Sequence, residues 1–236
     1  QSSGGFFSIG TKSSGGTLAE RFRIDSSGAV GFKKTPPSGS HTSWSQLFIG
    51  EKGTLISESA NSGGLFGTWL TDNMYIKQST GAFANVTTDQ TSAYKQEAGI
   101  HHWYSQASGS ADAAITLQER ARITSDGHFL VGQQTASSNT VGTSLRQDGR
   151  NFFCADGNYS AHFNRKSSSG AIVHFAKDDD IIGSIGVVGG DEMYIASAGT
   201  TAGSGLRFQN EGHLIYPTDG TGAVSNGDLD LGNSSY

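Results

Sequence analysis

The chain has 236 residues, a formal net charge of −5 and 34% hydrophobic residues, with 34 glycines and one cysteine. This acidic balance argues against a nucleic-acid surface, which shows clustered lysine and arginine, and no apolar run is long enough to span a membrane. The single cysteine, Cys154, excludes an intrachain disulfide and a cysteine-based zinc site, and its apolar setting in NFFCADG predicts a buried structural thiol.

Short apolar runs separated by Gly, Ser, Asn and Asp follow one another along the chain, and helical periodicity is almost absent. Clear examples occupy 46–59, 170–197 and 205–216. In the second of these, KDDD and GGDE separate three strand-like runs, which predicts an antiparallel meander. The whole pattern predicts an all-β fold. Because so few apolar residues make a poor solitary core, we expect repetition or oligomerisation to stabilise the chain.

One motif is repeated. Residues 17–28 (TLAERFRIDSSG) and 116–127 (TLQERARITSDG) are nearly identical and lie 99 positions apart, and a weaker third copy, GLRFQNEGHLIY, occupies 205–216. In each copy, strand-like apolar residues flank a turn that contains glycine, which can adopt positive φ. The motif therefore predicts a β-hairpin that closes each of three modules and serves a structural role.

The hairpins and the polar segments after them divide the chain into modules. The opening residues QSSGGFFSIG lack a methionine, so we expect the sequence to be cut from a longer protein. We expect the end of an upstream β module at 1–33, a linker at 34–43, a divergent β module at 44–132, a second linker at 133–142, a C-terminal β module at 143–217 and a polar exit segment at 218–236.

The pattern T-L-x-E-R-x-R-I-x-S-x-G, followed by a short apolar strand, resembles a segment common in tail fibres and tailspikes of tailed bacteriophages. HFNRKSSSGAIVHFAKDDDIIGSIGV (162–187) is similar to the stretch that these fibres carry before a C-terminal intramolecular chaperone, and DLDLGNSSY (228–236) is similar to the segment that leads into it. The resemblance covers most of 17–33 and 100–236. It is weaker over 44–99, where a receptor-binding part is expected to vary.

The resemblance implies an elongated, intertwined homotrimer of short antiparallel strands, located in the tail fibre of the virion. A following chaperone domain would trimerise the fibre and then cut itself off, using Ser and Lys in a motif of the S-D-x-x-x-K kind. That motif does not occur in this sequence, so we assign no catalytic residue. Separately, we expect no cofactor and no metal site. The implied partners are the other chains, the chaperone domain before cleavage, and a bacterial surface glycan or outer-membrane receptor.

We assign receptor contact to exposed aromatic side chains of the divergent module, because aromatic faces stack on sugar rings and anchor interfaces. Asp72 and Asn73, beside Trp69, would supply the polar contacts that orient a sugar. The dense cluster HHWY (101–104) is interpreted as a core or glycan-facing strand, because adjacent histidines on a strand point to opposite faces and cannot share a metal. The candidate binding residues are Trp44, Phe66, Trp69, Asp72, Asn73, Tyr75, His102 and Trp103, with Phe83 as a further aromatic.

Two charged clusters have structural interpretations. The Asp178-Asp179-Asp180 run lacks the EF-hand spacing and its terminal Glu, so we expect a solvated hairpin tip. Arg120 and Arg122 are placed on one strand face with Glu119 opposite, and their recurrence at module ends favours an ion-pair ladder over a phosphate-binding site.

A tailspike that cleaves polysaccharide needs two carboxylates about 5–9 Å apart in a cleft. The acidic residues of the divergent module, Glu51, Glu58, Asp72 and Glu97, show no spacing that singles out a pair. The sequence therefore predicts a non-enzymatic fibre part that attaches the virion to a bacterial surface structure. A polysaccharide-degrading tailspike fragment and a bacterial trimeric surface adhesin are the alternatives.

Overall fold

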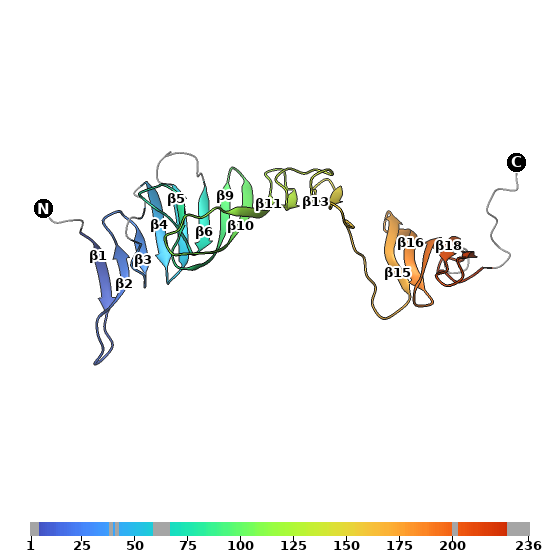
Figure 1. Cartoon of the computed structure of the whole chain (residues 1–236), viewed down its shortest axis with the longest axis horizontal. Helices are drawn as coiled ribbons and strands as arrows, with labels where there is room; N and C mark the ends of the chain where they lie inside the picture. Colours follow the sequence, from blue (N-terminus) through green and yellow to red (C-terminus); the bar gives the residue numbers. More distant parts are fainter. Residues whose placement is uncertain (1–4, 38–39, 41–42, 59–66, 200–202, 226–236) are drawn as a thin grey trace. The chain divides into compact units, whose positions relative to one another are not determined.

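The computed structural model describes residues 5–37, 40, 43–58, 67–199 and 203–225, and these residues form an all-β structure without a helix, as the sequence predicted. Accordingly, the described part of the chain contains no helix that could cross a membrane. The chain divides into two compact units, Gln1–Ser160 and Ala161–Tyr236, whose strands are labelled in Figure 1.

Twelve strands of the first unit form one sheet, in the order β1-β2-β3-β4-β5-β6-β9-β10-β11-β12-β13-β14, and Figure 1 shows them succeeding one another in a row. Neighbours are antiparallel except β3 and β4, which pair in parallel, and β7 and β8 form a separate hairpin. The strands are β1 (Phe7–Thr11), β2 (Ala19–Ile24), β3 (Val30–Phe32), β4 (Trp44–Ile49), β5 (Gly53–Glu58), β6 (Thr68–Asp72), β7 (Met74–Ile76), β8 (Phe83–Asn85), β9 (Asp89–Glu97), β10 (Ile100–Gly109), β11 (Gln118–Ile123), β12 (Phe129–Val131), β13 (Gly142–Leu145) and β14 (Asn151–Cys154).

The sheet continues across both segments that were expected to be linkers between modules. β3 pairs with β4 on either side of the segment 34–43, and β12 pairs with β13 on either side of the segment 133–142. The boundary between the two compact units falls between Ser160 and Ala161. The two segments are therefore connections within one sheet, because the strand edges that they separate satisfy each other's backbone hydrogen bonds.

The repeated motif forms the same three-stranded arrangement twice, as β1-β2-β3 and as β10-β11-β12. Both copies carry a β-bulge at the same point, between Ile9 and Gly10 in the first and between Trp103 and Tyr104 in the second. A glycine at positive φ lies in each of the two hairpin turns. The third copy forms the hairpin β18–β19. The prediction that the motif forms a hairpin is confirmed in all three copies.

One face of the large sheet is covered by the β7–β8 hairpin and by the segment that runs into β11. Ile115 donates its backbone N–H to the Phe83 carbonyl, which ties that segment to β8. The main core lies between this layer and the sheet. It contains buried Trp44, Ile56, Trp69, Met74, Ile76 and Ala93, against which Phe83, Tyr104, Ile115 and Leu117 pack.

The second unit is a five-stranded antiparallel sheet in the order β15-β16-β17-β18-β19, so the predicted meander is confirmed. Asp178 and Asp179 form the turn between its first two strands at positive φ, as expected for a hairpin tip. Residues 226–236, which include DLDLGNSSY, lie outside the described residues. The strands are β15 (Gly170–Lys177), β16 (Asp180–Val188), β17 (Glu192–Ser197), β18 (Gly205–Phe208) and β19 (Ile215–Thr218).

Candidate functional site

The face of the large sheet opposite the β7–β8 hairpin presents one apolar side chain from nearly every strand. Residues that pair across neighbouring strands lie on the same face of a sheet. The observed registers join twelve such positions, one from each strand, into a single row across the sheet, here called the central row. It consists of Phe7, Ile24, Val30, Leu47, Leu55, Leu70, Tyr94, Trp103, Ala121, Val131, Thr143 and Phe153, of which Thr143 alone is not apolar.

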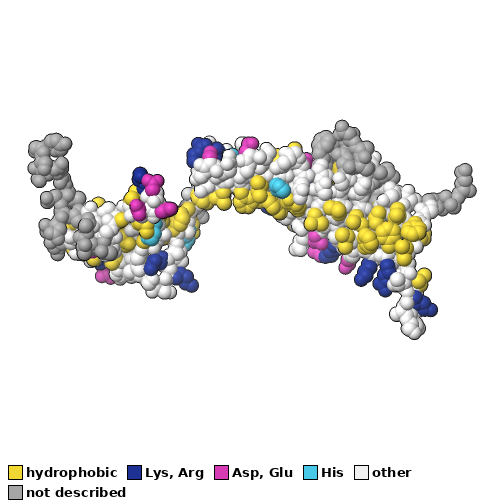
Figure 2. Space-filling view, turned by 180° about the vertical axis from the view of Figure 1, so that it is seen from behind, with side chains coloured by type: hydrophobic (Ala, Val, Ile, Leu, Met, Phe, Trp, Pro, Cys, Tyr) yellow, Lys and Arg dark blue, Asp and Glu magenta, His cyan; other side chains and the backbone are white. Residues whose placement is uncertain are grey.

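Much of the central row is exposed to solvent in the single chain. Leu70 is 58% exposed, Phe7 56% and Phe153 49%. Figure 2 shows hydrophobic side chains as a band that follows this sheet. An antiparallel sheet with one solvated face normally carries polar residues there, and monomers rarely expose a long contiguous apolar patch. This face therefore has the character of an interaction surface.

The centre of the open face is aromatic. The Tyr94 ring lies 5.5 Å from the Trp103 ring and is stacked on His101 at 5.9 Å. A shallow depression of about 350 Å³ beside them is lined in part by Asp72 and Ser92. Asp72 and Trp103 are the predicted binding residues that the structure brings together here.

The prediction that Trp44, Trp69 and Tyr75 are exposed is wrong. They are 6%, 3% and 0% exposed and belong to the core under the covering layer. Trp69 makes an edge contact with Phe83 at 5.0 Å and a tilted contact with Tyr104 at 5.5 Å. Successive residues of a strand face opposite sides, so Trp44 and Trp69 take the covered face of the sheet while their sequence neighbours take the open one. Tyr75 lies in the covering hairpin itself, on β7, where all three residues are buried.

Tyr75 is fixed by a polar contact as well as by packing. Its hydroxyl donates a hydrogen bond of 2.6 Å to Oδ1 of Asp112, and burial together with this carboxylate raises the pKa of Tyr75 well above its ordinary value. Tyr75 is thus a structural residue. The remaining aromatic candidate, Phe66, lies outside the described residues.

Asn73 is a structural hub, contrary to the prediction that it contacts a ligand. It is fully buried, at a φ of 62°, a left-handed conformation that asparagine tolerates better than most residues. Its Nδ2 donates to the carbonyl oxygens of Thr87, Asp89 and Gln90 at 3.1–3.2 Å. Its Oδ1 accepts from the backbone N–H and the hydroxyl of Thr87. The side chain holds the approach to β9 in place.

His102 lies on the covered face, in a charge network that links β9, β10 and β11. Its Nδ1 is 3.2 Å from Oε2 of Glu119, and its Nε2 is 3.5 Å from Oε1 of Glu97. Lys95 pairs with Glu97 at 2.5 Å, and Arg122 with Glu119 at 2.5 Å. Burial raises the pKa of Glu119, but hydrogen bonds from Arg122 and His102 outweigh it, so this pKa is lowered.

His101 and His102 face opposite sides of β10, as predicted. Nδ1 of His101 is hydrogen-bonded to the Tyr94 hydroxyl on the open face, whereas His102 is buried on the covered face. In the described part of the chain, no group of three or more His, Cys, Asp or Glu side chains is placed to hold a metal ion.

The repeated arginines are arranged differently from the prediction. Arg122 and Glu119 lie on the same face of β11 and pair with each other, because the bulge at Arg120 shifts the alternation by one residue. Arg120 donates instead to the hydroxyl of Ser105 at 2.8 Å. The first copy repeats both interactions. The ion pairs are therefore a structural part of the repeat, formed within one strand.

The acidic residues considered for hydrolysis do not form a pair in one cleft, as far as their side chains belong to the described part of the chain. Asp72 pairs with Ser92 on the open face, whereas Glu97 bonds Lys95 on the covered face. The Glu51 side chain is exposed in the turn after β4, and that of Glu58 lies outside the described residues. Asp72 and Glu97 therefore cannot act on the same glycosidic bond.

The sheet of the second unit also has one buried and one exposed face. Tyr194 and Ala196 of β17 are buried on one face, while Met193 and Ile195 are 46% and 45% exposed on the other. Two rows of the pairing cross this open face: Val173, Ile185, Ile195, Leu206 and Pro217, and Gly170, Val187, Met193, Phe208 and Ile215.

Sequence reasoning missed the central row. Its members were visible as apolar residues in strand-like runs, for example Leu70 beside Trp69. The sequence does not show which of two neighbouring residues on a strand faces the covering layer.

Comparisons with protein-family models, with curated proteins and with solved structures found no match for this chain.

Proposed function

We propose that this chain is a trimeric, non-enzymatic part of a bacteriophage tail fibre that attaches the virion to a polysaccharide of the bacterial surface. The observation that carries the proposal is the central row, a line across twelve strands that is apolar except at Thr143 and much of which is exposed in the single chain. It accords with the resemblance of the repeated hairpin to fibre and tailspike segments.

The row has the geometry needed to line a shared axis. Strands spaced about 4.8 Å apart give twelve strands a row about 50 Å long, running across the strands. Three such sheets, each turning its row inward, form a closed prism in which every chain covers the others. Burying a half-exposed large apolar side chain stabilises by about 1 kcal/mol, so the row supplies on the order of 10 kcal/mol per chain toward association.

This arrangement directs receptor contact to the outer face. With the open faces turned inward, the solvent-facing layer of each chain is the β7–β8 hairpin and the segment against it. The β7–β8 hairpin of this layer belongs to the part of the chain, 44–99, where the fibre resemblance is weakest. Three copies allow weak individual glycan contacts to act together, because linked sites bind with a high effective concentration.

The test is binding of the full chain to a panel of intact bacterial strains, before and after periodate oxidation of their surface glycans. We expect binding to some strains that oxidation abolishes, with no reducing ends released from purified polysaccharide. Binding that survives oxidation would point to a protein receptor, and release of reducing ends would establish the hydrolase alternative.

A further inference from the structure

We infer that Phe32 and Ile49 of one chain insert into a hollow on the next copy of the same chain, at Gly28, Ser45 and Ser57. The inference rests on the proposed assembly around a shared axis and adds the side chains that set how neighbouring chains fit.

Two rows flank the central row, one on each side, and their side-chain sizes are complementary. The first flanking row is bulky on β1 to β4 and small or polar on β5 to β10. The second is small or polar on β4 to β9 and bulky on β10 to β13. The first row consists of Ile9, Phe22, Phe32, Ile49, Gly53, Asp72, Ser92 and Ser105; the second consists of Ser45, Ser57, Thr68, Gln96, His101, Ile123, Phe129 and Leu145.

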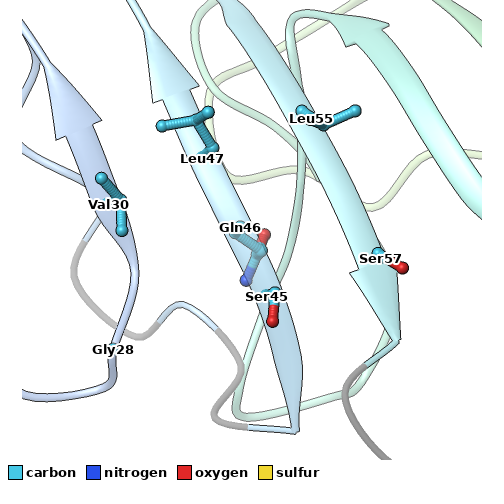
Figure 3. Close-up of a pocket in the computed structure, with 7 residues that line it drawn as sticks. All are labelled: Gly28, Val30, Ser45, Gln46, Leu47, Leu55 and Ser57. Carbon is cyan, nitrogen blue, oxygen red and sulfur yellow. The ribbon is translucent and has the colours of Figure 1, made fainter.

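The small residues of the second flanking row leave a hollow in the open face. It has a volume of about 240 Å³, and Figure 3 shows the residues that line it on β3, β4 and β5, with Gly28 in the turn before β3. Val30, Leu47 and Leu55 give it apolar walls, with Ser45 and Ser57 beside them. An apolar cavity of about 150 Å³ already accommodates a benzene ring, so a phenylalanine ring fits here.

Symmetry brings the bulky residues to this hollow. Rotation about an axis that runs along the row keeps each strand at its own level, and it sets the first flanking row of one chain against the second flanking row of the next. In such cyclic assemblies the two contacting patches differ. At the level of β3 and β4, Phe32 and Ile49, 45% and 52% exposed in the single chain, therefore meet the small residues of the neighbour. At the level of β10 the sizes reverse, with Ser105 set against His101.

The first experiment exchanges volume between the two rows. Ser45→Phe fills the hollow, and the same overpacking then occurs at each equivalent interface. We expect the association constant, measured by analytical ultracentrifugation, to fall at least about 100-fold. Adding Phe32→Ala to that variant should restore assembly to within about tenfold of the original chain. Ser79→Phe, in the exposed turn after β7, is the matched control and should leave assembly unchanged.

The second experiment does not depend on the folding of an overpacked variant. In a Cys154→Ala background, Phe32→Cys with Ser45→Cys should form covalent multimers on oxidation, whereas Phe32→Cys with Ser79→Cys should not. Within one chain the first pair is about four residues apart along the strands, roughly 13 Å, too far for an internal disulfide. If the original chain assembles but neither experiment gives these results, the docking is wrong and the proposed function stands. If the original chain is a monomer, both the docking and the proposed function are wrong.

Discussion

Leu70→Glu places a charge in the middle of the central row and separates the stability of the chain from its assembly. Leu70 is 58% exposed and projects from β6 between Leu55 and Tyr94. In the single chain the glutamate side chain stays in water, so the sheet should fold normally. In the trimer three glutamates meet near the axis, in the apolar interior that the row creates.

The magnitude follows from the chemistry of a buried carboxylate. Completing the burial of Leu70 is worth about 1–1.5 kcal/mol per chain, which the substitution removes. Neutralising a glutamate at pH 7, against ordinary titration near pH 4.3, costs about 3.7 kcal/mol, which caps the penalty for burying it. Three chains together therefore lose up to about 15 kcal/mol of assembly free energy at pH 7, about half of what the three rows supply, and we expect monomers at the concentrations used in light scattering.

The assay is light scattering of Leu70→Glu at pH 7 and at pH 4.5, beside Leu70→Gln and Thr80→Glu. We expect Leu70→Glu to be monomeric at pH 7 and to recover assembly at pH 4.5. Leu70→Gln should be weakened equally at both pH values, and Thr80→Glu, in an exposed turn, should be unaffected. A Leu70→Glu variant that assembles fully at pH 7 would refute the reasoning, because Leu70 would then lie outside the interface.

Three further outcomes test how the chain is held together. Asn73→Ala removes five hydrogen bonds of a fully buried side chain, and we expect urea denaturation to show a loss of about 3–5 kcal/mol; a loss under about 1 kcal/mol would contradict the role of Asn73 as a hub. The pKa of Glu119 is lowered in the folded chain, so the carboxylate contributes fully to the free energy of unfolding above its ordinary pKa of 4.5, and this contribution is lost as the pH falls through the lowered pKa. Glu119→Gln should therefore make the free energy of unfolding depend less on pH below about pH 4.5. A pH dependence equal to that of the original chain would contradict the role of the charge network. Trp69→Ala should lower the stability of the single chain by about 3–5 kcal/mol, whereas Trp103→Ala, at a site 37% exposed, should spare that stability and weaken assembly; equal effects on stability would contradict the assignment of the two faces.

Local patterns in the sequence predicted much of the fold. The hairpins of the repeated motif and the meander of the second unit follow from short alternating apolar runs and from glycine and aspartate turns, which act within a few residues. The parallel pairing of β3 with β4 and the continuity of the sheet across 133–142 depend on contacts between distant segments. No local signal in those segments specifies them.

The candidate site was harder to predict than the fold. Trp69 and Leu70 are adjacent and both apolar, yet one is core and the other belongs to the open face, because the β7–β8 hairpin covers one side of the sheet. The polar amide of Asn73 predicts a contact with a sugar, but in the structure this amide binds backbone carbonyl groups before and in β9. The bulge at Arg120 reversed the expected faces of the repeated charges, since one extra residue shifts the alternation.

The native mass of the chain in solution is the most direct test of the account. Light scattering of the full chain should give about three times the 24.7 kDa of one chain, or about 74 kDa, and this mass should persist on dilution. A stable species of 24.7 kDa over the same range of concentration would contradict the account, because the central row would then remain exposed to water without a partner.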